Sequence, residues 1–245
     1  MTEPQGFDLF YLDKHYIAFK NSSFNYWNRK RAIKKCYRKN IRNDAGLVLV
    51  DIGCGISPVT PKPESTLFLD CAAEALTHLR KKGYSTKEGD ITNLPIEHSF
   101  ADVVFCSEVL EHVADYRTAL KELHRILKTG GRLFLTVPVH AKYWGSDDEF
   151  VGHVTRFELD PFKNLLAETG FEIVEEKPVG SWLERKITRR GVKVFMRQKT
   201  KEPFGKMVVL ASRVVNLAAY LAVLISLLFA SRESTSIMLY CCRKK

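Results

Sequence analysis

The 245-residue chain lacks several features that would place it in a specialised structural class. It has no internal repeat and no low-complexity tract, which excludes a solenoid. Its cysteines form no Cys-x-x-Cys pair and no Cys/His cluster at zinc-site spacing. We therefore expect reduced thiols that act as small apolar side chains. The six residues are Cys36, Cys54, Cys71, Cys106, Cys241 and Cys242.

The N-terminus lacks the pattern of a secretory signal peptide. Glu3, Asp8 and Asp13 interrupt it, and it has neither a basic leading segment nor a sustained apolar stretch. This composition predicts that the folded body stays in the cytoplasm.

The formal net charge of +10 is not spread evenly along the chain. Residues 29–42 contribute +8, residues 185–206 contribute +8, and the three residues 243–245 contribute +3. The rest of the chain is therefore mildly acidic. The positive charge is thus confined to separate patches on an acidic body. Such patches favour local contacts with an anionic surface.

Apolar runs alternate with helical patterns from Gly46 onward, which is typical of βαβ units and a largely parallel sheet. Several runs, such as Val-Leu-Val-Asp-Ile, are apolar at consecutive positions, as expected of strands buried on both faces. The expected strands are 47–52, 66–69, 84–88, 101–107, 132–137, 171–179 and 236–242, and the expected helices are 28–40, 116–128 and 158–169.

A tight glycine turn follows the first expected strand, where Asp51 is followed by Gly53 and Gly55. Glycines are needed where a ligand approaches the backbone so closely that a Cβ atom would collide with it. The turn is not a dinucleotide fingerprint of the Gly-x-Gly-x-x-Gly type, because Pro58 occupies the third glycine position. This departure argues against a nicotinamide-dependent dehydrogenase.

From Gly46 to Gly180 the chain resembles the class I S-adenosylmethionine-dependent methyltransferases, in particular those of quinone and lipid biosynthesis. Five landmarks in order carry the resemblance, although Ser57 stands where the last glycine of the first motif often lies. They are Asp51-x-Gly53-x-Gly55, the acid Asp70 after the second strand, Asp90-Ile91 after the third, the fourth-strand segment that contains Ser107 and Glu108, and Leu-Lys-Thr-Gly-Gly at 127–131.

The resemblance implies the fold, the cofactor and the cofactor-binding residues. The fold would be α/β, with a Rossmann-like, mostly parallel seven-stranded sheet, helices on both faces and an apolar helical insertion before the last strand. Asp70 would bind the ribose hydroxyls of S-adenosylmethionine, and Asp90 with Ile91 would contact the adenine. Ser107 and Glu108 would lie beside the methionine moiety.

The segment after the fifth strand resembles the acceptor loop of one subgroup of these enzymes, with Thr155 in place of the usual first arginine. The matching residues are Trp144, Asp148, Glu149, Gly152, His153, Arg156 and Phe157. We interpret His153 as an acceptor-site base or orienting group with Asp148 as its partner, and His112 as a second catalytic candidate. The candidate substrate-binding residues are His140, Tyr143, Trp144 and Arg156. Each histidine could instead be structural, and we expect no metal.

Nucleic-acid substrates have little support in the sequence. The chain lacks the Asn/Asp-Pro-Pro-Tyr tetrad and the Pro-Cys nucleophile of nucleic-acid methyltransferases. We expect no DNA partner, and only the basic patches favour RNA.

Residues 207–230 form a long apolar run that is interrupted only by Ser212, Arg213, Asn216 and Ser226. The run is long enough to cross a bilayer, but a single crossing would separate the last strand from its sheet. This conflict favours an interfacial or re-entrant helix pair, with the basic stretch 185–206 drawn to anionic lipid. A spanning anchor remains open only if residues 236–242 are not a sheet strand.

These patterns predict four regions: an N-terminal aromatic and basic helical lid at 1–45, the cofactor-binding core at 46–180, a basic and apolar membrane-facing insertion at 181–234, and the last strand with a basic tail at 235–245. The protein would sit peripherally or monotopically on the inner face of the membrane. It would methylate an O or C atom of a lipophilic acceptor, such as a prenylated quinone precursor or a lipid headgroup. The alternatives are a soluble acceptor with the apolar segment as a lid or homodimer contact, and a non-catalytic adaptor.

Overall fold

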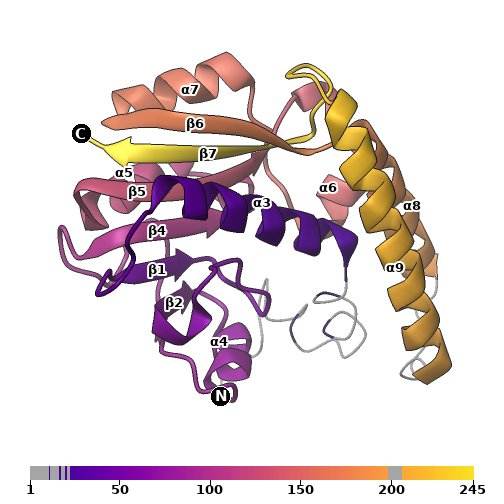
Figure 1. Cartoon of the computed structure of the whole chain (residues 1–245), viewed down its shortest axis with the longest axis horizontal. Coiled ribbons are helices and arrows are strands. Elements are labelled where there is room, and N and C mark those ends of the chain that lie inside the picture. The colour runs from indigo at the N-terminus through magenta and orange to yellow at the C-terminus, as the bar shows by residue number, and fades with distance from the viewer. Residues whose placement is uncertain (1–10, 12–16, 18–19, 21–22, 198–205) are drawn as a thin grey trace.

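A computed structural model describes residues 11, 17, 20, 23–197 and 206–245 (Figure 1). The described residues form one seven-stranded sheet with the order β3-β2-β1-β4-β5-β7-β6. β7 is antiparallel to both of its neighbours, and β1 to β5 pair in parallel. The strands are β1 (Leu49–Ile52), β2 (Thr66–Asp70), β3 (Thr86–Glu88), β4 (Ala101–Ser107), β5 (Leu127–Pro138), β6 (Phe171–Gly180) and β7 (Ile237–Lys244). The predicted seven-stranded, mostly parallel sheet is confirmed.

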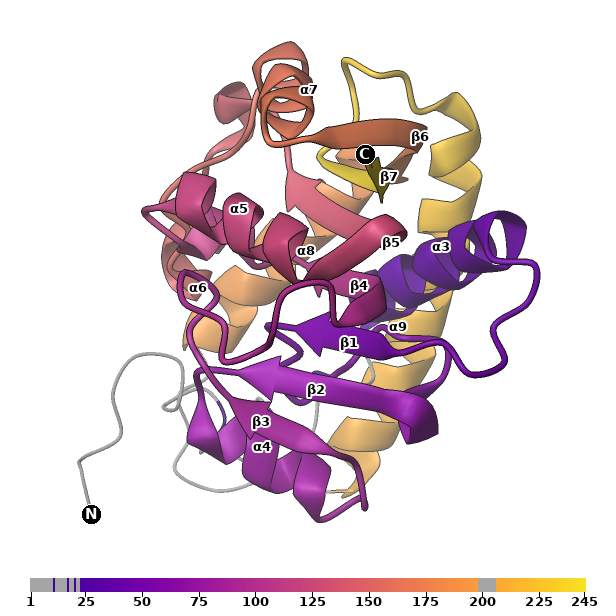
Figure 2. The ribbon, with the colours of Figure 1, turned by 90° about the vertical axis from the view of Figure 1, so that its left-hand side faces the viewer.

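Helices cover both faces of this sheet, as Figure 2 shows. They are α3 (Phe24–Asn40), α4 (Ala73–Arg80), α5 (Tyr116–Ile126), α6 (Ser146–Val151), α7 (Leu159–Glu168), α8 (Trp182–Arg197) and α9 (Lys206–Ser226). The described part of the chain also has four short 3-10 turns: η1 (Pro63–Ser65), η2 (Leu110–His112), η3 (Ala141–Tyr143) and η4 (Leu227–Phe229).

Two apolar layers hold the helices on the sheet. On one face, α5 and α7 bury an apolar stripe against β4, β5 and β7, with Leu120, Leu123 and Phe162 at its centre. On the other face, α3 packs Ile33 and Tyr37 against the inner strands. Asp115 caps the N-terminus of α5, because its side chain accepts a hydrogen bond from the backbone N–H of Thr118, in the first turn of the helix.

Some expected boundaries are wrong. The helix expected at 116–128 ends at Ile126, and Leu127 already pairs with Ala101 as the first residue of β5. Lys128 therefore does not close the helix, and its ammonium instead binds the Asp102 carboxylate at 2.8 Å. The expected third strand shortens to β3, and the first expected helix begins at Phe24 instead of residue 28.

The region between β6 and β7 is a pair of helices, α8 and α9, which we call the helical arm. Its two helices lie side by side at one end of the sheet (Figure 1). α9 also contacts α3, where Asn216 accepts a hydrogen bond from the backbone N–H of Phe24 at 3.2 Å. Trp27 and Tyr220 meet edge to face in the same contact. The arm is thus attached to the core by specific contacts.

The last strand returns to the sheet after the arm. β7 pairs with β5 from Arg132 to Pro138 and with β6 on its other edge. The alternative of a spanning anchor required a final segment outside the sheet, so the pairing of β7 argues against it.

Phe134 belongs to the apolar core: it is fully buried on β5 and stacks on Phe105 with ring centroids 5.4 Å apart. Phe134→Ala should lower the free energy of unfolding by about 3–5 kcal/mol, because it removes apolar contacts and leaves a cavity. Phe100→Ala is the matched control: that ring is 38% exposed, so the loss should stay below about 1 kcal/mol. Urea denaturation measures both, and equal losses would contradict this account of the core.

Candidate active site

A cavity of about 540 Å³ opens at the carboxyl ends of the parallel strands. One side is formed by the glycine turn after β1 and by the ends of β2 and β4. The opposite side is formed by the loop around α6 and by residues of α8. The strand order reverses between β1 and β4, which is the usual ligand position in open parallel sheets.

The glycine turn is shaped by two left-handed backbone positions. Gly53 has φ 65° and Gly55 has φ 50°, a region that residues with a Cβ atom rarely adopt. A Cβ atom on Gly53 would lie 2.4 Å from the Val109 side chain. The turn therefore needs glycine at both positions, and both glycines line the cavity.

Asp70 lies at the end of β2 and lines the cavity, although only 7% of it is exposed. Its two carboxylate oxygens accept hydrogen bonds from the backbone N–H groups of Gly55 at 2.8 Å and Ala72 at 2.9 Å. The carboxylate thus holds the glycine turn at the wall of the cavity. The cavity wall also includes Asp90, Ile91, Ser107 and Glu108, whose contact with a cofactor stays a prediction.

Asp51 has a different position from the other predicted cofactor residues. It is not among the residues that line the cavity. Its carboxylate accepts the backbone N–H groups of Val59 at 3.3 Å and Thr60 at 3.4 Å, which holds the segment after the glycine turn. Burial raises the pKa of Asp51 to about 7. Its direct contact with a cofactor stays a prediction.

Glu108 presents a buried oxygen to the same site. Its Oε1 atom has no hydrogen-bond partner among the described residues, and its Oε2 atom lies 3.9 Å from the Arg29 guanidinium. The backbone of Glu108 has φ 57°, which is uncommon for a residue other than glycine. A ligand that donates a hydrogen bond would satisfy the buried oxygen.

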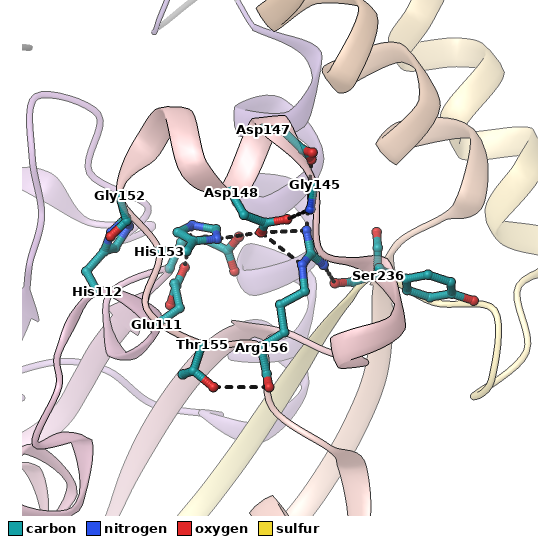
Figure 3. A network of polar contacts seen from close by, with 12 residues as sticks. Glu111, His112, Gly145, Asp147, Asp148, Gly152, His153, Thr155, Arg156 and Ser236 are labelled. Atoms are coloured by element: carbon teal, nitrogen blue, oxygen red, sulfur yellow. Dashed lines mark hydrogen bonds and ion pairs between the residues drawn. The ribbon is translucent and has the colours of Figure 1, made fainter.

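Asp148 organises the opposite side of the cavity (Figure 3). Its carboxylate accepts hydrogen bonds from the backbone N–H of Gly145 at 2.9 Å, from Nδ1 of His153 at 2.7 Å and from Nε of Arg156 at 2.9 Å. Burial acts to raise the pKa of Asp148, but the bonds from His153 and Arg156 outweigh it and hold the pKa below its usual value. The predicted pairing of Asp148 with His153 is present.

His112 and Glu111 come from η2 and face His153 across the site (Figure 3). The His112 and His153 rings lie edge to face with centroids 4.7 Å apart, and His153 Nε2 is 3.7 Å from Glu111 Oε1. Burial and the neighbouring His153 lower the pKa of His112 to about 4, and burial raises the pKa of Glu111 well above its usual value. Glu111 was not among the predicted site residues; the fold brings His153 to the adjacent pair Glu111 and His112.

The predicted substrate residues are divided between the cavity and the outer surface of the loop. Arg156 lines the cavity, but Asp148 already pairs with its guanidinium at 2.8 Å. His140, Tyr143 and Trp144 are not among the lining residues. His140 contacts the carbonyl oxygen of Arg232, and Tyr143 donates to that of Glu233, so these two residues fasten the loop to the chain after the helical arm.

Residues outside the predicted set also reach the cavity. From α8, Glu184, Arg185, Thr188 and Val192 line it, and burial raises the pKa of Glu184 to about 8. From the N-terminal region, Tyr11, Lys20, Asn25, Tyr26 and Arg29 line it, and the role of this region as a lid stays a prediction. Phe7, Phe10, Tyr16 and Phe19 lie outside the described residues.

Residues 50–135, which hold the glycine turn and the acids after β2 and β3, match the family model of a methyltransferase domain. Over these residues the chain is similar to a methyltransferase domain, within the fold of class I methyltransferases. The match ends before the acceptor loop and the helical arm, so the family model covers the cofactor half of the cavity.

Curated relatives of this methyltransferase domain are distant in sequence. A probable S-adenosylmethionine-dependent methyltransferase of Mycolicibacterium smegmatis is 23% identical over 184 residues, which cover 71% of each chain. The 2-methyl-6-phytyl-1,4-hydroquinone methyltransferase of Spinacia oleracea chloroplasts is 25% identical over 162 residues, which cover 61% of this chain and 46% of the spinach protein. The chain spans about half the length of several curated relatives that it matches.

A solved structure shares the whole methyltransferase architecture. The S-adenosylmethionine-dependent methyltransferase of Thermotoga maritima, described as a possible histamine N-methyltransferase, has a TM-score of 0.63 at 18% identity, and the alignment covers 98% of both chains. At this identity the likeness shows the fold alone.

S-adenosylmethionine is the cofactor of this methyltransferase domain. The site fits it in three respects that the structure shows. The glycine turn lets a ligand approach the backbone, Asp70 offers a carboxylate for paired hydroxyls, and Glu108 has a buried oxygen that needs a donor.

The buried carboxyl group of Asp51 should make the stability of the ligand-free protein depend on pH. Since its folded pKa of about 7 lies above the unfolded value, Asp51 ionises more readily in the unfolded chain. The free energy of unfolding should therefore fall between about pH 4 and 7, by at most about 1.4 kcal/mol per pH unit, and Asp51→Asn should abolish this fall. Urea denaturation of both proteins across this range measures the difference.

Asp102→Asn is the control of opposite sign. Hydrogen bonds from Lys128 and Val48 outweigh burial and hold the pKa of Asp102 below its usual value. Its contribution to stability is present above about pH 4 and is lost as the pH falls through the lower folded pKa. Parallel pH profiles for wild type and Asp51→Asn would contradict the assignment to Asp51.

Proposed function

We propose that this chain transfers the methyl group of S-adenosylmethionine to an O or C atom of a lipophilic acceptor at a membrane surface. A prenylated quinone precursor is the acceptor class that we favour, with a lipid headgroup as the second. One observation carries the proposal: a single cavity joins the cofactor-side acids to the Asp148–His153 pair and is walled by a helical arm with an exposed apolar face.

Methyl transfer requires the protein mainly to align the acceptor atom with the methyl group of the cofactor. S-adenosylmethionine supplies a methyl group on a sulfonium, whose carbon is already electrophilic. The residues of this chain have to hold the acceptor atom in line with it and exclude water. His153 suits this task because Asp148 fixes its ring through Nδ1 and leaves Nε2 on the opposite side. We assign His153 to the binding of the acceptor's nucleophilic atom.

The apolar face of the arm supports a lipid partner. The stretch Ser212–Phe229 is long and apolar enough to cross a membrane, and only 11% of it is buried in the structure. Its exposed side chains follow a helical stripe, which in a water-soluble helix would instead face the core. They include Val214, Leu217, Leu221, Ile225 and Leu228, each more than half exposed.

The neighbouring helix adds the charges that an anionic surface would attract. Lys186, Arg190 and Lys193 are exposed on α8 at helical spacing, with Trp182 one turn before them. Cationic and aromatic side chains of this kind favour the interface of a bilayer with anionic lipid. Because β7 returns to the sheet, we propose that the arm lies on the membrane and does not cross it.

The arm also contacts the acceptor loop. Arg189 of α8 binds Asp147 of α6 at 2.8 Å, next to Asp148. Glu184 and Thr188 of the same helix line the cavity. An acceptor that enters from the membrane would therefore reach His153 along α8. The spinach relative, which is described as acting on a phytyl hydroquinone, is consistent with this acceptor class.

The activity prediction uses cofactor labelled with tritium in its methyl group and a membrane extract of the source cell. We expect the label in the organic phase, in a product that mass spectrometry identifies by a gain of one methyl group. His153→Ala should reduce the transfer at least about 100-fold, because it removes the group that binds the acceptor. Its affinity for the cofactor, measured by calorimetry, should stay within about threefold of wild type.

His98→Ala is the matched control, because this histidine is not among the residues that line the cavity. It should transfer label at the wild-type rate. Label that remains only in the aqueous phase would refute a lipophilic acceptor, and would favour the soluble-acceptor alternative.

The membrane prediction is a flotation experiment with vesicles that contain about one third anionic lipid. Wild-type protein should float with the vesicles and should be released by high salt, because part of the attraction is electrostatic. The double variant Leu221→Glu/Ile225→Glu should stay at the bottom of the gradient, since it places two carboxylates on the apolar stripe.

Val174→Glu provides the control, because this residue is 43% exposed but lies on β6, away from the arm. It should float like wild type. If wild type and the double variant both fail to float, while both are folded, the apolar stripe is a contact between protein chains and the membrane proposal is wrong. Sedimentation equilibrium would then show a dimer that the double variant lacks.

A further inference from the structure

Glu111 is a buried carboxylate that the structure leaves without hydrogen bonds. Its residue exposure is 0%, and neither Oε1 nor Oε2 has a hydrogen-bond partner among the described residues. Burial of such a group is costly unless a cation or several donors compensate it. Its nearest basic neighbour, His153 Nε2, is 3.7 Å away, which is too long for a hydrogen bond. In its ionised form, this carboxylate would therefore need a positively charged partner.

The two histidines beside Glu111 are held in the orientation of metal ligands. His153 is fixed through Nδ1 by the Asp148 carboxylate at 2.7 Å, and His112 through Nδ1 by the carbonyl oxygen of Gly152 at 3.2 Å. A ring whose Nδ1–H donates to such an acceptor carries its lone pair on Nε2. This second contact, most often to a carboxylate or a backbone carbonyl, is the usual support of a metal-bound histidine.

The ligand atoms of Glu111, His112 and His153 all lie within 4.8 Å of one another. We infer that these three residues bind a divalent first-row transition-metal ion at the acceptor end of the cavity. Two imidazoles and one carboxylate form a set that favours cobalt, zinc, iron or manganese over calcium or magnesium. His112 and His153 line the cavity, so the remaining coordination positions of the ion face the acceptor.

The distances fit an ion of this class after small side-chain rotations. Ligand atoms that each stand about 2.0–2.2 Å from one ion are about 3.0–4.3 Å apart. The separation of 3.7 Å between His153 Nε2 and Glu111 Oε1 falls inside this range. The largest separation, up to 4.8 Å, needs a movement of about half an ångström. Both histidines retain some exposure to the cavity, which gives the ion a path to the site.

The consequence for catalysis rests on the proposed function. An acceptor hydroxyl that binds the ion has a lower pKa and loses its proton to water. The oxygen then forms a bond to the methyl carbon as the carbon–sulfur bond breaks, and sulfur keeps the bonding pair. His153 holds the ion in this arrangement, so the loss of transfer in His153→Ala and the loss of the ion would have one cause.

The rival explanation is an internal ion pair in which a doubly protonated His153 neutralises Glu111. Metal binding separates the two explanations, because the ion pair needs no ion. Under the ion-pair explanation Glu111→Gln should destabilise the protein, and wild type should bind added metal no better than the variant.

The experiment is a titration of the full chain, without a polyhistidine tag and without cofactor, with Co²⁺. Visible absorption of Co²⁺ reports nitrogen and oxygen ligands, and thermal unfolding reports stabilisation. Wild type should bind one Co²⁺ per chain with a rise in Tm. Glu111→Gln and His112→Asn should each bind Co²⁺ at least tenfold more weakly and show no rise in Tm.

Glu184→Gln is the matched control, because Glu184 is also a buried carboxylate on the cavity wall but lies outside the cluster. It should keep the wild-type affinity for Co²⁺. Equal affinities of wild type and Glu111→Gln would overturn the metal site. Since the titration needs neither acceptor nor methyl transfer, Co²⁺ binding without transfer to lipid would refute the proposed function and leave the metal site standing.

Discussion

Parallel pairing of β1 with β2 on one edge and β4 on the other sets the position of the groups on the cofactor side of the cavity. The three strands run in one direction, so their carboxyl ends open onto the same side of the sheet. The chain leaves β1 and β4 toward opposite halves of the sheet, and the gap between these exits holds the glycine turn and Glu108. The cofactor half of the cavity is therefore a property of strand order, on which loops of varied sequence can be built.

The acceptor half depends on one carboxylate. Asp148 joins the start of α6, the ring of His153 and the guanidinium of Arg156; its bond from Arg156 is buried, where polar contacts are strong, and the other two are partly buried. The same loop is tied to α8 through Asp147 and Arg189. A change in the position of the helical arm would thus move the acceptor loop with it, which gives the arm a route to influence the site.

Much of the fold follows from short-range patterns, and the site follows only in part. Buried parallel strands are apolar at consecutive positions, so β1 and β4 could be predicted from composition alone. The end of α5 could not, because Leu127 gains more from pairing beside Ala101 than from another helical turn. Asp148 and His153 are five residues apart and fit a local motif. Glu111 was missed because its importance arises from burial and from a histidine that is distant in sequence.

The place of β7 between β5 and β6 has a consequence for biosynthesis. The ribosome releases β5 and β6 well before β7, the last strand of eight residues. The edges of β5 and β6 that will pair with β7 therefore keep unpaired backbone groups while the helical arm is synthesised. The nascent chain cannot complete its sheet by folding in order from the N-terminus. An arm that settles early on a lipid surface would keep these edges apart from other chains, and the final strand would then close the sheet in a single late step.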